Sequence, residues 1–202
     1  MHNLRKNKRN IAIFKRIYNM KIGFQGDIFS NAEEATDRFI KKLNVQNVVP
    51  VALITSKNVV SSLINKEIDY GVMAIKNSIA GDVAETKEAL TEHIELVDTA
   101  EIDIHHCLFT KNNQAKIHCV ASHIQALMQT VNNRKKILNN VIEVECIDTA
   151  LAAKMLFSGE YPENYAVICR KNAGNFYNLH LLAENIEDDK SNKTLFGLFK
   201  LK

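Results

Sequence analysis

Short apolar runs that alternate with amphipathic helical patterns are the feature of this chain that most constrains its fold. The runs carry β-branched residues and are too short to be buried helices, so they predict strands. In the first half we expect strands at residues 22–24, 48–54 and 70–75, with helices that begin at Ser30 and Ser56. A βαβαβ order of this kind implies parallel strands, right-handed crossovers and helices on both faces of a sheet.

Helix start signals support this alternation. Ser30 with Glu33, and Ser122 with Gln125, have the spacing of capping boxes. Pro50 places the second strand at a sheet edge or at the opening of a strand. The helix of the second crossover is expected to bury the stripe Val60, Leu63 and Ile64.

The same pattern starts again in the second half of the chain. Asp148 or Thr149 is expected to cap its last helix, and the strands are expected at residues 94–99, 104–109, 117–121, 141–146 and 165–169. Two βαβαβ runs joined by a long extended segment predict an α/β protein with two lobes. We place the lobes at residues 21–105 plus about 195–202, and at residues 106–194. A cleft between two such lobes is a default ligand site.

Small polar residues gather at the predicted strand-to-helix turns. The third strand ends in Lys76, Asn77 and Ser78, and the next helical pattern opens at Ala80-Gly81-Asp82. Similar turns lie at Gly26 to Ser30, at Ser122 and at Asp148-Thr149. Several helix N-termini that converge on one cleft suit a small molecule bearing carboxylates. The alternative is that each turn is only a cap or a polar connection without a ligand.

Composition excludes several classes of protein. The chain has 202 residues, of which 46% are hydrophobic and 24% charged, as in an ordinary globular protein with one or two cores. No apolar run approaches the roughly 20 residues that span a bilayer, so no membrane helix is expected. The four cysteines form no C-x-x-C pair in a chain without a secretion signal, which predicts reduced thiols in a cytoplasmic protein.

Positive charge is concentrated at the start of the chain. Residues 1–20 hold six Lys or Arg and no acid, which leaves 20 basic and 23 acidic residues in the remainder. A mildly acidic body argues against a nucleic-acid-binding domain. The four-residue apolar core at residues 11–14 is too short for a signal peptide. We expect residues 1–20 to be a disordered extension whose deletion from 2 to 19 leaves stability and ligand binding largely intact; a tail that binds an acidic surface is the alternative.

Histidine and cysteine neighbours invite the hypothesis of a metal site, because both are zinc ligands. They occur at His105-His106-Cys107, at His118-Cys119 and at His123. Adjacent residues on a strand point to opposite faces, so neither the pair His105 and His106 nor the pair His118 and Cys119 can bind a metal together. We expect buried or cleft-lining side chains instead. We expect neither a metal nor another cofactor.

Four co-linear motifs resemble those of the prephenate dehydratases. Residues 70–81 resemble the family block D-Y-G-V-x-P-I-E-N-S-x-x-G, residues 122–127 resemble S-H-P-Q-A-L, residues 148–153 resemble S-T-A-x-A-A, and residues 192–196 resemble N-x-T-R-F. Their order and spacing match over residues 21–200. The resemblance implies a two-lobed fold similar to the type II periplasmic binding proteins. It also implies conversion of the anion prephenate to phenylpyruvate, with loss of carbon dioxide and water, in L-phenylalanine biosynthesis.

The resemblance also implies site residues. Thr194 is the expected catalytic residue, and the expected substrate ligands are Ser30, Lys76, Asn77, Ser78, Ser122, Thr149 and Phe196. Three departures stand out: Lys76 replaces the family Glu, Leu195 replaces the catalytic Arg, and the loop from Gly26 to Ser30 is shortened. Loss of one group that stabilises the leaving hydroxide typically costs a factor of about 10² to 10³ in rate. Efficient dehydration would then need Lys76 to act from across the cleft.

Three functions therefore remain open. The first is a divergent prephenate dehydratase, which we take as the main hypothesis. The second resembles the non-aromatising prephenate decarboxylases, which need no donor at the ring hydroxyl, and the third is a ligand-binding protein without catalysis. We expect a homodimer, because homodimers are the commonest assembly. Family members commonly continue into an ACT domain, whereas this sequence stops at Lys202, so we expect no ACT domain and no allosteric response to phenylalanine.

Overall fold

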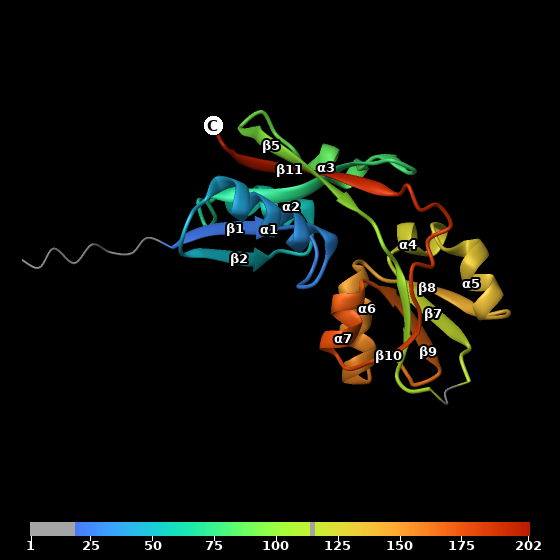
Figure 1. The fold of residues 1–202 in the computed structure, drawn as a ribbon. Coiled ribbons are helices and arrows are strands. Elements are labelled where there is room, and N and C mark those ends of the chain that lie inside the picture. Colours follow the sequence, from blue (N-terminus) through green and yellow to red (C-terminus); the bar gives the residue numbers. More distant parts are fainter. Residues whose placement is uncertain (1–18, 114–115) are drawn as a thin grey trace, which may run out of the picture.

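Two mixed β-sheets, one in each lobe, organise the chain (Figure 1). The computed structural model describes residues 19–113 and 116–202, so nearly all of the extension expected at residues 1–20 lies outside the described residues. The first sheet has the order β2-β1-β3-β11-β5, with short β4 beside β3, and the second has the order β10-β6-β9-β7-β8. The strands of the first sheet are β1 (Met20–Phe24), β2 (Val48–Ala52), β3 (Tyr70–Asn77), β4 (Gly81–Asp82), β5 (Ile94–Asp103) and β11 (Lys193–Leu201). Those of the second are β6 (Cys107–Thr110), β7 (Cys119–Ser122), β8 (Ile142–Glu145), β9 (Tyr165–Cys169) and β10 (His180–Ala183).

Both predicted βαβαβ runs are present. β1 pairs in parallel with β2 and β3, and β7 pairs in parallel with β8 and β9. Pro50 lies on β2, which is an edge strand as expected. The helices are α1 (Asn31–Leu43), α2 (Ser56–Ile64), α3 (Ala84–Ala89), α4 (Ile124–Met128), α5 (Val131–Ile137), α6 (Thr149–Ser158) and α7 (Lys171–Phe176). The predicted two-lobed α/β architecture is confirmed.

The start of α1 follows from its cap. Ser30 Oγ accepts the Glu33 N–H at 3.3 Å, and the Glu33 carboxylate accepts the Phe29 N–H at 2.6 Å. The predicted cap is therefore correct, with Phe29 rather than Ser30 as the reciprocal donor. The helix buries Ala35 and Phe39 against the first sheet.

Two other caps lie one residue from their predicted position. Thr55 rather than Ser56 caps α2, with Oγ1 3.1 Å from the Asn58 nitrogen. His123 rather than Ser122 precedes α4, because β7 continues through Ser122 and keeps that residue extended. The predicted stripe of α2 is also wrong at one position: Ile64 is 42% exposed, and the core-facing residues are Val59, Val60 and Leu63.

Two extended segments connect the lobes (Figure 1). Residues 104–106 lead from β5 to β6, and residues 184–192 lead from β10 back to β11. β11 then pairs antiparallel with both β3 and β5. The last strand thus brings Thr194 into register with Asn77, next to the cleft. In the ranges 19–113 and 116–202, no helix has the length and apolar character needed to cross a membrane.

Gly174 provides a test of how α7 packs against the second sheet. A Cβ at this position would lie 2.3 Å from Phe109 Cζ, a buried ring on β6. We expect Gly174→Ala to lower the free energy of unfolding by about 1–3 kcal/mol, the usual cost of overpacking. Urea unfolding measures it, with the exposed neighbour Asn175→Ala as the control. Equal stability of the two variants would contradict the packing described.

Candidate functional site

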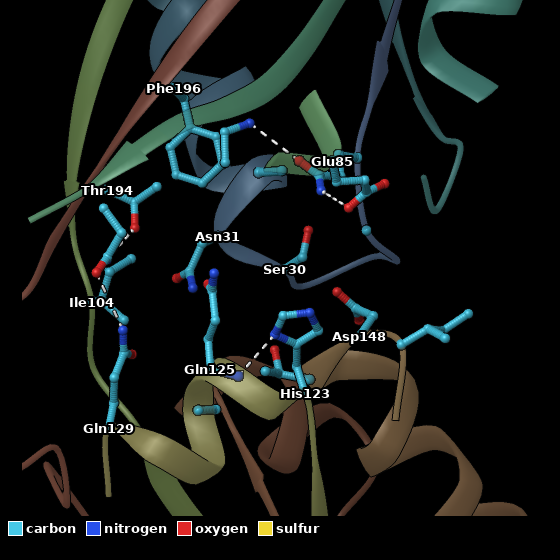
Figure 2. A pocket seen from close by; sticks show the side chains of 18 of the residues that line it. Ser30, Asn31, Glu85, Ile104, His123, Gln125, Gln129, Asp148, Thr194 and Phe196 are labelled. Carbon is cyan, nitrogen blue, oxygen red and sulfur yellow. Dashed lines mark hydrogen bonds between the residues drawn. The ribbon is translucent and has the colours of Figure 1, made fainter. Parts of the chain in front are cut away.

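Residues of both lobes surround a cavity of about 130 Å³ (Figure 2). It is small beside the roughly 300–1,000 Å³ of typical ligand pockets, so a compact ligand is indicated. Its charged or titratable side chains are two carboxylates and two imidazoles, and no Lys or Arg occurs among the described residues that line it. The polar lining residues are Gln25, Ser30, Asn31, Asn77, Glu85, His106, His123, Gln125, Gln129, Asp148, Thr149 and Thr194. The remaining lining residues are Gly26, Ala32, Ile54, Ala74, Ile104, Ala126, Ile147 and Phe196.

The structure brings together five of the eight site residues expected from the sequence. They are Ser30, Asn77, Thr149, Thr194 and Phe196.

Lys76 does not line the cavity. β3 continues through Asn77, and neighbouring strand residues face opposite ways, so a strand that turns Asn77 toward the cavity turns Lys76 away. Lys76 is exposed and lies in register with Leu195 on β11 and Asp82 on β4. The expectation that Lys76 acts from across the cleft has no support in this geometry.

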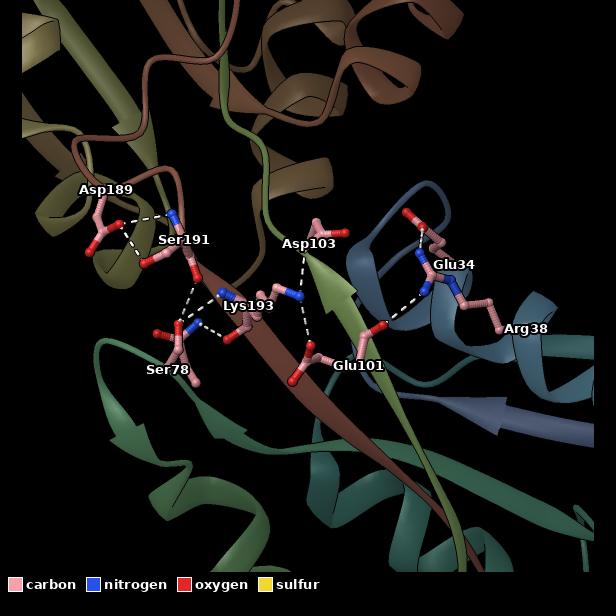
Figure 3. Close-up of polar contacts among 9 residues, drawn as sticks. Glu34, Arg38, Ser78, Glu101, Asp103, Asp189, Ser191 and Lys193 are labelled. Atoms are coloured by element: carbon pink, nitrogen blue, oxygen red, sulfur yellow. Dashed lines mark hydrogen bonds and ion pairs between the residues drawn. The ribbon is translucent and has the colours of Figure 1, made fainter.

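Ser78 and Ser122 also lie outside the cavity. Ser78 Oγ accepts the Lys193 N–H at 2.9 Å and lies 3.4 Å from the carbonyl oxygen of Ser191 (Figure 3). Ser122 is fully buried, and its hydroxyl donates to the Ile168 carbonyl at 2.6 Å. Both hydroxyls join segments of backbone. The helix expected to open at Ala80-Gly81-Asp82 begins later, because β4 (Gly81–Asp82) lies between the end of β3 and α3.

The amide of Asn77 orients the Thr194 hydroxyl. Asn77 Oδ1 accepts the N–H groups of Ile79 at 3.0 Å and Ala80 at 2.9 Å, which identifies the other amide atom as the nitrogen. Asn77 Nδ2 lies 2.9 Å from Thr194 Oγ1, and it also reaches the side chain of Asn192 and the Lys193 carbonyl. Because Thr194 Oγ1 accepts this bond, its own hydrogen remains available to a ligand in the cavity.

Gln129 extends this network to the second lobe. Its Nε2 donates to Asn77 Oδ1 at 3.3 Å, and its Oε1 accepts from Asn192 Nδ2 at 2.9 Å. His106 Nε2 lies 2.9 Å from the same oxygen and is therefore the protonated ring nitrogen. Burial lowers the pKa of His106, against the opposing effect of this hydrogen bond, so the ring is neutral at pH 7. The side chain of Gln129 thus bonds to one residue from each connecting segment, His106 and Asn192.

The first turn of α1 offers polar groups to the cavity. The N–H groups of Asn31 and Ala32 have no acceptor within the helix, and the N-terminus carries the positive end of the helix dipole. The side-chain oxygen of Asn31 is buried and has no hydrogen-bond partner among the described residues. It faces the cavity in Figure 2. A ligand can therefore bond to both donors and an acceptor here.

Asp148 caps the start of α6. Its Oδ1 accepts the N–H groups of Ala150 at 2.8 Å and Leu151 at 2.9 Å. Burial raises the pKa of the Asp148 carboxyl, and the two helix N–H bonds oppose part of that rise. Its carboxyl group already accepts the N–H groups at the start of α6, which leaves α1 as the better place for an anionic ligand.

The shortened loop from Gly26 to Ser30 closes against the second lobe. A Cβ on Gly26 would lie 2.9 Å from Asp148 Oδ2, and the Gly26 φ of +90° also favours glycine. Beside it, the Glu85 carboxylate is held by Gln25 Nε2 and by the Ser56 N–H, both at 2.7 Å.

Sequence reasoning missed several lining residues. Asn31 could have been found, since it directly follows a predicted cap and so belongs to a first helical turn. Gln129 carries no local signal, because its partners lie up to 63 residues away in sequence. His106, expected as a buried or cleft-lining side chain, is buried and lines the cavity. Within the part of the chain that the structure describes, no group of three or more His, Cys, Asp or Glu side chains is placed to hold a metal ion.

Comparisons with known proteins agree with this arrangement. A family model described as prephenate dehydratase matches residues 22–202. The chain is 41% identical over 132 residues to a prephenate dehydratase of Methanocaldococcus jannaschii, a match that covers 63% of this chain and 46% of that protein. It is 36% identical over 134 residues to arogenate dehydratase/prephenate dehydratase 1, chloroplastic, of Arabidopsis thaliana, covering 64% and 33%. The matches thus span between a third and a half of these curated relatives.

A solved structure shows the same fold. The prephenate dehydratase from Arthrobacter aurescens in complex with L-Phe has a TM-score of 0.78 and 21% identity, covering 91% of this chain and 61% of that one. The expected two-lobed α/β fold is confirmed.

The raised pKa of Asp148 gives a prediction for stability against pH. The folded state holds this proton over a pH range in which the unfolded state has lost it, so the parent loses stability as pH rises above about 3.9. Asp148→Asn keeps an oxygen for the two N–H groups and removes the titration. We expect its free energy of unfolding, relative to the parent, to increase with pH.

Urea unfolding of both proteins from about pH 3 to about pH 8 measures this difference. Asp189→Asn is the control with the opposite sign, because hydrogen bonds from Ser191 lower the pKa of Asp189. A difference between parent and Asp148→Asn that is constant with pH would show that the Asp148 pKa is unshifted.

Proposed function

The chain belongs to the prephenate dehydratase family, whose model matches residues 22–202, and on this premise we propose that its cleft converts prephenate to phenylpyruvate. The reaction breaks the bond from the ring to the carboxylate, releases carbon dioxide and expels the ring hydroxyl at the far carbon. The electron pair of the first bond makes the ring aromatic. The departing oxygen leaves as water once it receives a proton.

The observation that carries this proposal is the orientation of Thr194. Its oxygen accepts from the fixed Asn77 amide, so the hydroxyl hydrogen is not used in that bond and can be donated to the leaving oxygen in the cavity. A donor already aimed at developing charge needs no reorganisation during the reaction. His123 is a second candidate donor, since its Nδ1 accepts the Gln125 N–H and the proton of the neutral ring then lies on Nε2. In this proposal, substrate carboxylates meet the N–H groups of Asn31 and Ala32.

The replacement of the family Arg by Leu195 lies on the other face of β11. Thr194 and Phe196 line the cavity and Leu195 does not, as alternation along a strand requires. Leu195 lies instead between Lys76 on β3 and Glu101 on β5. In this conformation neither Lys76 nor Leu195 lines the cavity, so neither of these two replacements changes a group that would touch a ligand.

One observation favours a second candidate function. No Lys or Arg occurs among the described lining residues, so a dianion meets helix N–H groups, hydroxyls, amides and imidazoles, together with the carboxyl groups of Glu85 and Asp148. A helix terminus typically contributes about 0.3–1 kcal/mol to the binding of an anion, up to about 2 in favourable geometry. Such a site fits a protein that binds a small carboxylate without turning it over.

Product analysis tests the proposal against its alternatives. The purified chain is incubated with prephenate at neutral pH while phenylpyruvate and the dihydro-hydroxyphenylpyruvate of simple decarboxylation are followed. Phenylpyruvate supports the dehydratase, and the dihydro product supports the decarboxylase. If neither forms but prephenate raises the melting temperature, the binding protein is supported.

Thr194→Ala should lower the rate of phenylpyruvate formation by about 10²–10³, the usual cost of losing one such donor. Thr194→Ser should keep most of the rate, because it retains the hydroxyl. The exposed Thr99→Ala on the neighbouring strand β5 is the control. A Thr194→Ala protein as fast as the parent would remove Thr194 from the mechanism.

Leu195→Arg should change the rate by less than about threefold, or less than about 0.7 kcal/mol of barrier. The new guanidinium would lie between Lys76 and Glu101, outside the cavity. Steady-state kinetics with prephenate measures it. An increase of tenfold or more would mean that residue 195 reaches the substrate in the reacting conformation.

We also propose a role in L-phenylalanine biosynthesis, a cytoplasmic location and a homodimer. The family assignment supports the first, the separated cysteines the second, and the prevalence of twofold assemblies the third.

A further inference from the structure

Arg170 makes a set of contacts between the lobes that the proposed chemistry does not use. It directly follows β9 in the second lobe, and its guanidinium reaches the first lobe at the start of α1. Nη1 donates to the Ser30 carbonyl at 3.0 Å and lies 3.5 Å from the Phe29 carbonyl, and Nη2 pairs with the Glu34 carboxylate. The side chain is 19% exposed, so this ion pair is screened less than a surface pair.

The loop that Arg170 holds is the one that closes the cavity. Phe29 adopts a left-handed φ of 67°, a conformation that non-glycine residues rarely adopt. Two further contacts from the second lobe reach the same loop: the Phe176 ring lies 4.5 Å from the Phe29 ring, and Lys154 Nζ lies 3.7 Å from the Asp27 carboxylate. The loop conformation therefore depends on the position of the second lobe.

Arg38 provides an internal comparison, because it also pairs with Glu34. Its Nη2 lies 2.9 Å from Glu34 Oε1, one helical turn away, and its Nη1 donates to the Glu101 carbonyl at 2.8 Å (Figure 3). Both of these contacts stay within the first lobe. Arg170 and Arg38 share one carboxylate, and Arg170 alone of the two connects it to the other lobe.

We infer that Arg170 is a positioning residue that clasps the lobes together and places Ser30 and the first turn of α1 against a bound ligand. The clasp itself follows from the contacts, and its effect on turnover rests on the proposed function. Since the guanidinium bonds two loop carbonyls and a carboxylate at once, it restrains the loop in a way that a single charge does not.

Hydrogen exchange of the ligand-free protein tests the clasp without any assay of activity. In Arg170→Gln we expect the amides of residues 26–31 to exchange about tenfold faster or more, while those of β9 exchange as in the parent. Arg38→Gln, the matched control, should leave exchange at residues 26–31 unchanged. Arg170→Lys, which keeps the charge but not the fork of donors, should be intermediate.

Kinetics with prephenate then tests the positioning role. We expect Arg170→Gln to raise KM about tenfold with kcat within about threefold, because the contact orders the binding site before chemistry. Arg38→Gln should match the parent. If the parent does not turn over prephenate, the proposed function fails, whereas the exchange result still decides whether the clasp exists.

Unchanged exchange at residues 26–31 in Arg170→Gln would overturn the inference, as would equal effects of the two arginine variants. Should Arg170→Gln fail to fold, Arg170→Lys carries the test, and exchange equal to that of the parent would then overturn it.

Discussion

The side-chain amide of Asn77 fixes the relation among three parts of the candidate site. Its oxygen is held by two backbone N–H groups of its own turn, and its nitrogen reaches Thr194, which is 117 residues away in sequence. Gln129 bonds to it from the second lobe. Each of these groups is buried or half-buried, and a buried polar group left without a partner costs about 1–3 kcal/mol. The hydroxyl, the amides and the neutral His106 ring therefore form one arrangement in which a change at any member disturbs the others.

Electrostatics in the cleft depends on dipoles and not on cations. The cavity contains the carboxylates of Glu85 and Asp148, and Glu85 is already satisfied by two short hydrogen bonds. Attraction for an anion comes from the N–H groups of Asn31 and Ala32, which have no acceptor within α1. These groups are effective only if the Gly26–Ser30 loop keeps its position, because that loop leads directly into the helix. The small volume of the cavity and the contacts of this loop with the second lobe thus belong to the same conformation.

Much of the fold could be predicted from the sequence, because apolar runs and capping residues are local signals. The parallel strands, the edge position of Pro50 and the cap at Ser30 all followed from such signals. The errors that changed the candidate site came from strand ends. β7 continues through Ser122 and β3 through Asn77, beyond the ends expected at residues 121 and 75, and the position of a strand end decides which side chains face the cleft. Lys76 was misplaced for this reason, since its neighbour and not Lys76 itself lines the cavity.

The rest of the site could not be predicted because it depends on contacts between distant segments. Gln129 belongs to no motif, whereas Asn192 was expected only as part of a family motif and His106 only as a buried or cleft-lining side chain. The roles of all three arise where the two connecting segments pass the C-terminal end of α4. Arg170 is a polar residue beside the end of a strand, like many others in the chain. Only the packing of one lobe on the other distinguishes it.

The position of β11 in the first sheet has a consequence for the order in which the chain can fold. β11 lies between β3 and β5, yet it follows the whole second lobe in sequence. The second sheet is built from one continuous stretch, so it can form while the chain is still emerging from the ribosome. Until residues 193–201 are synthesised, the edges of β3 and β5 that pair with β11 have no partner strand between them. During synthesis the N-terminal lobe is therefore the last to complete its sheet, and it is the lobe most exposed to chaperones and proteases.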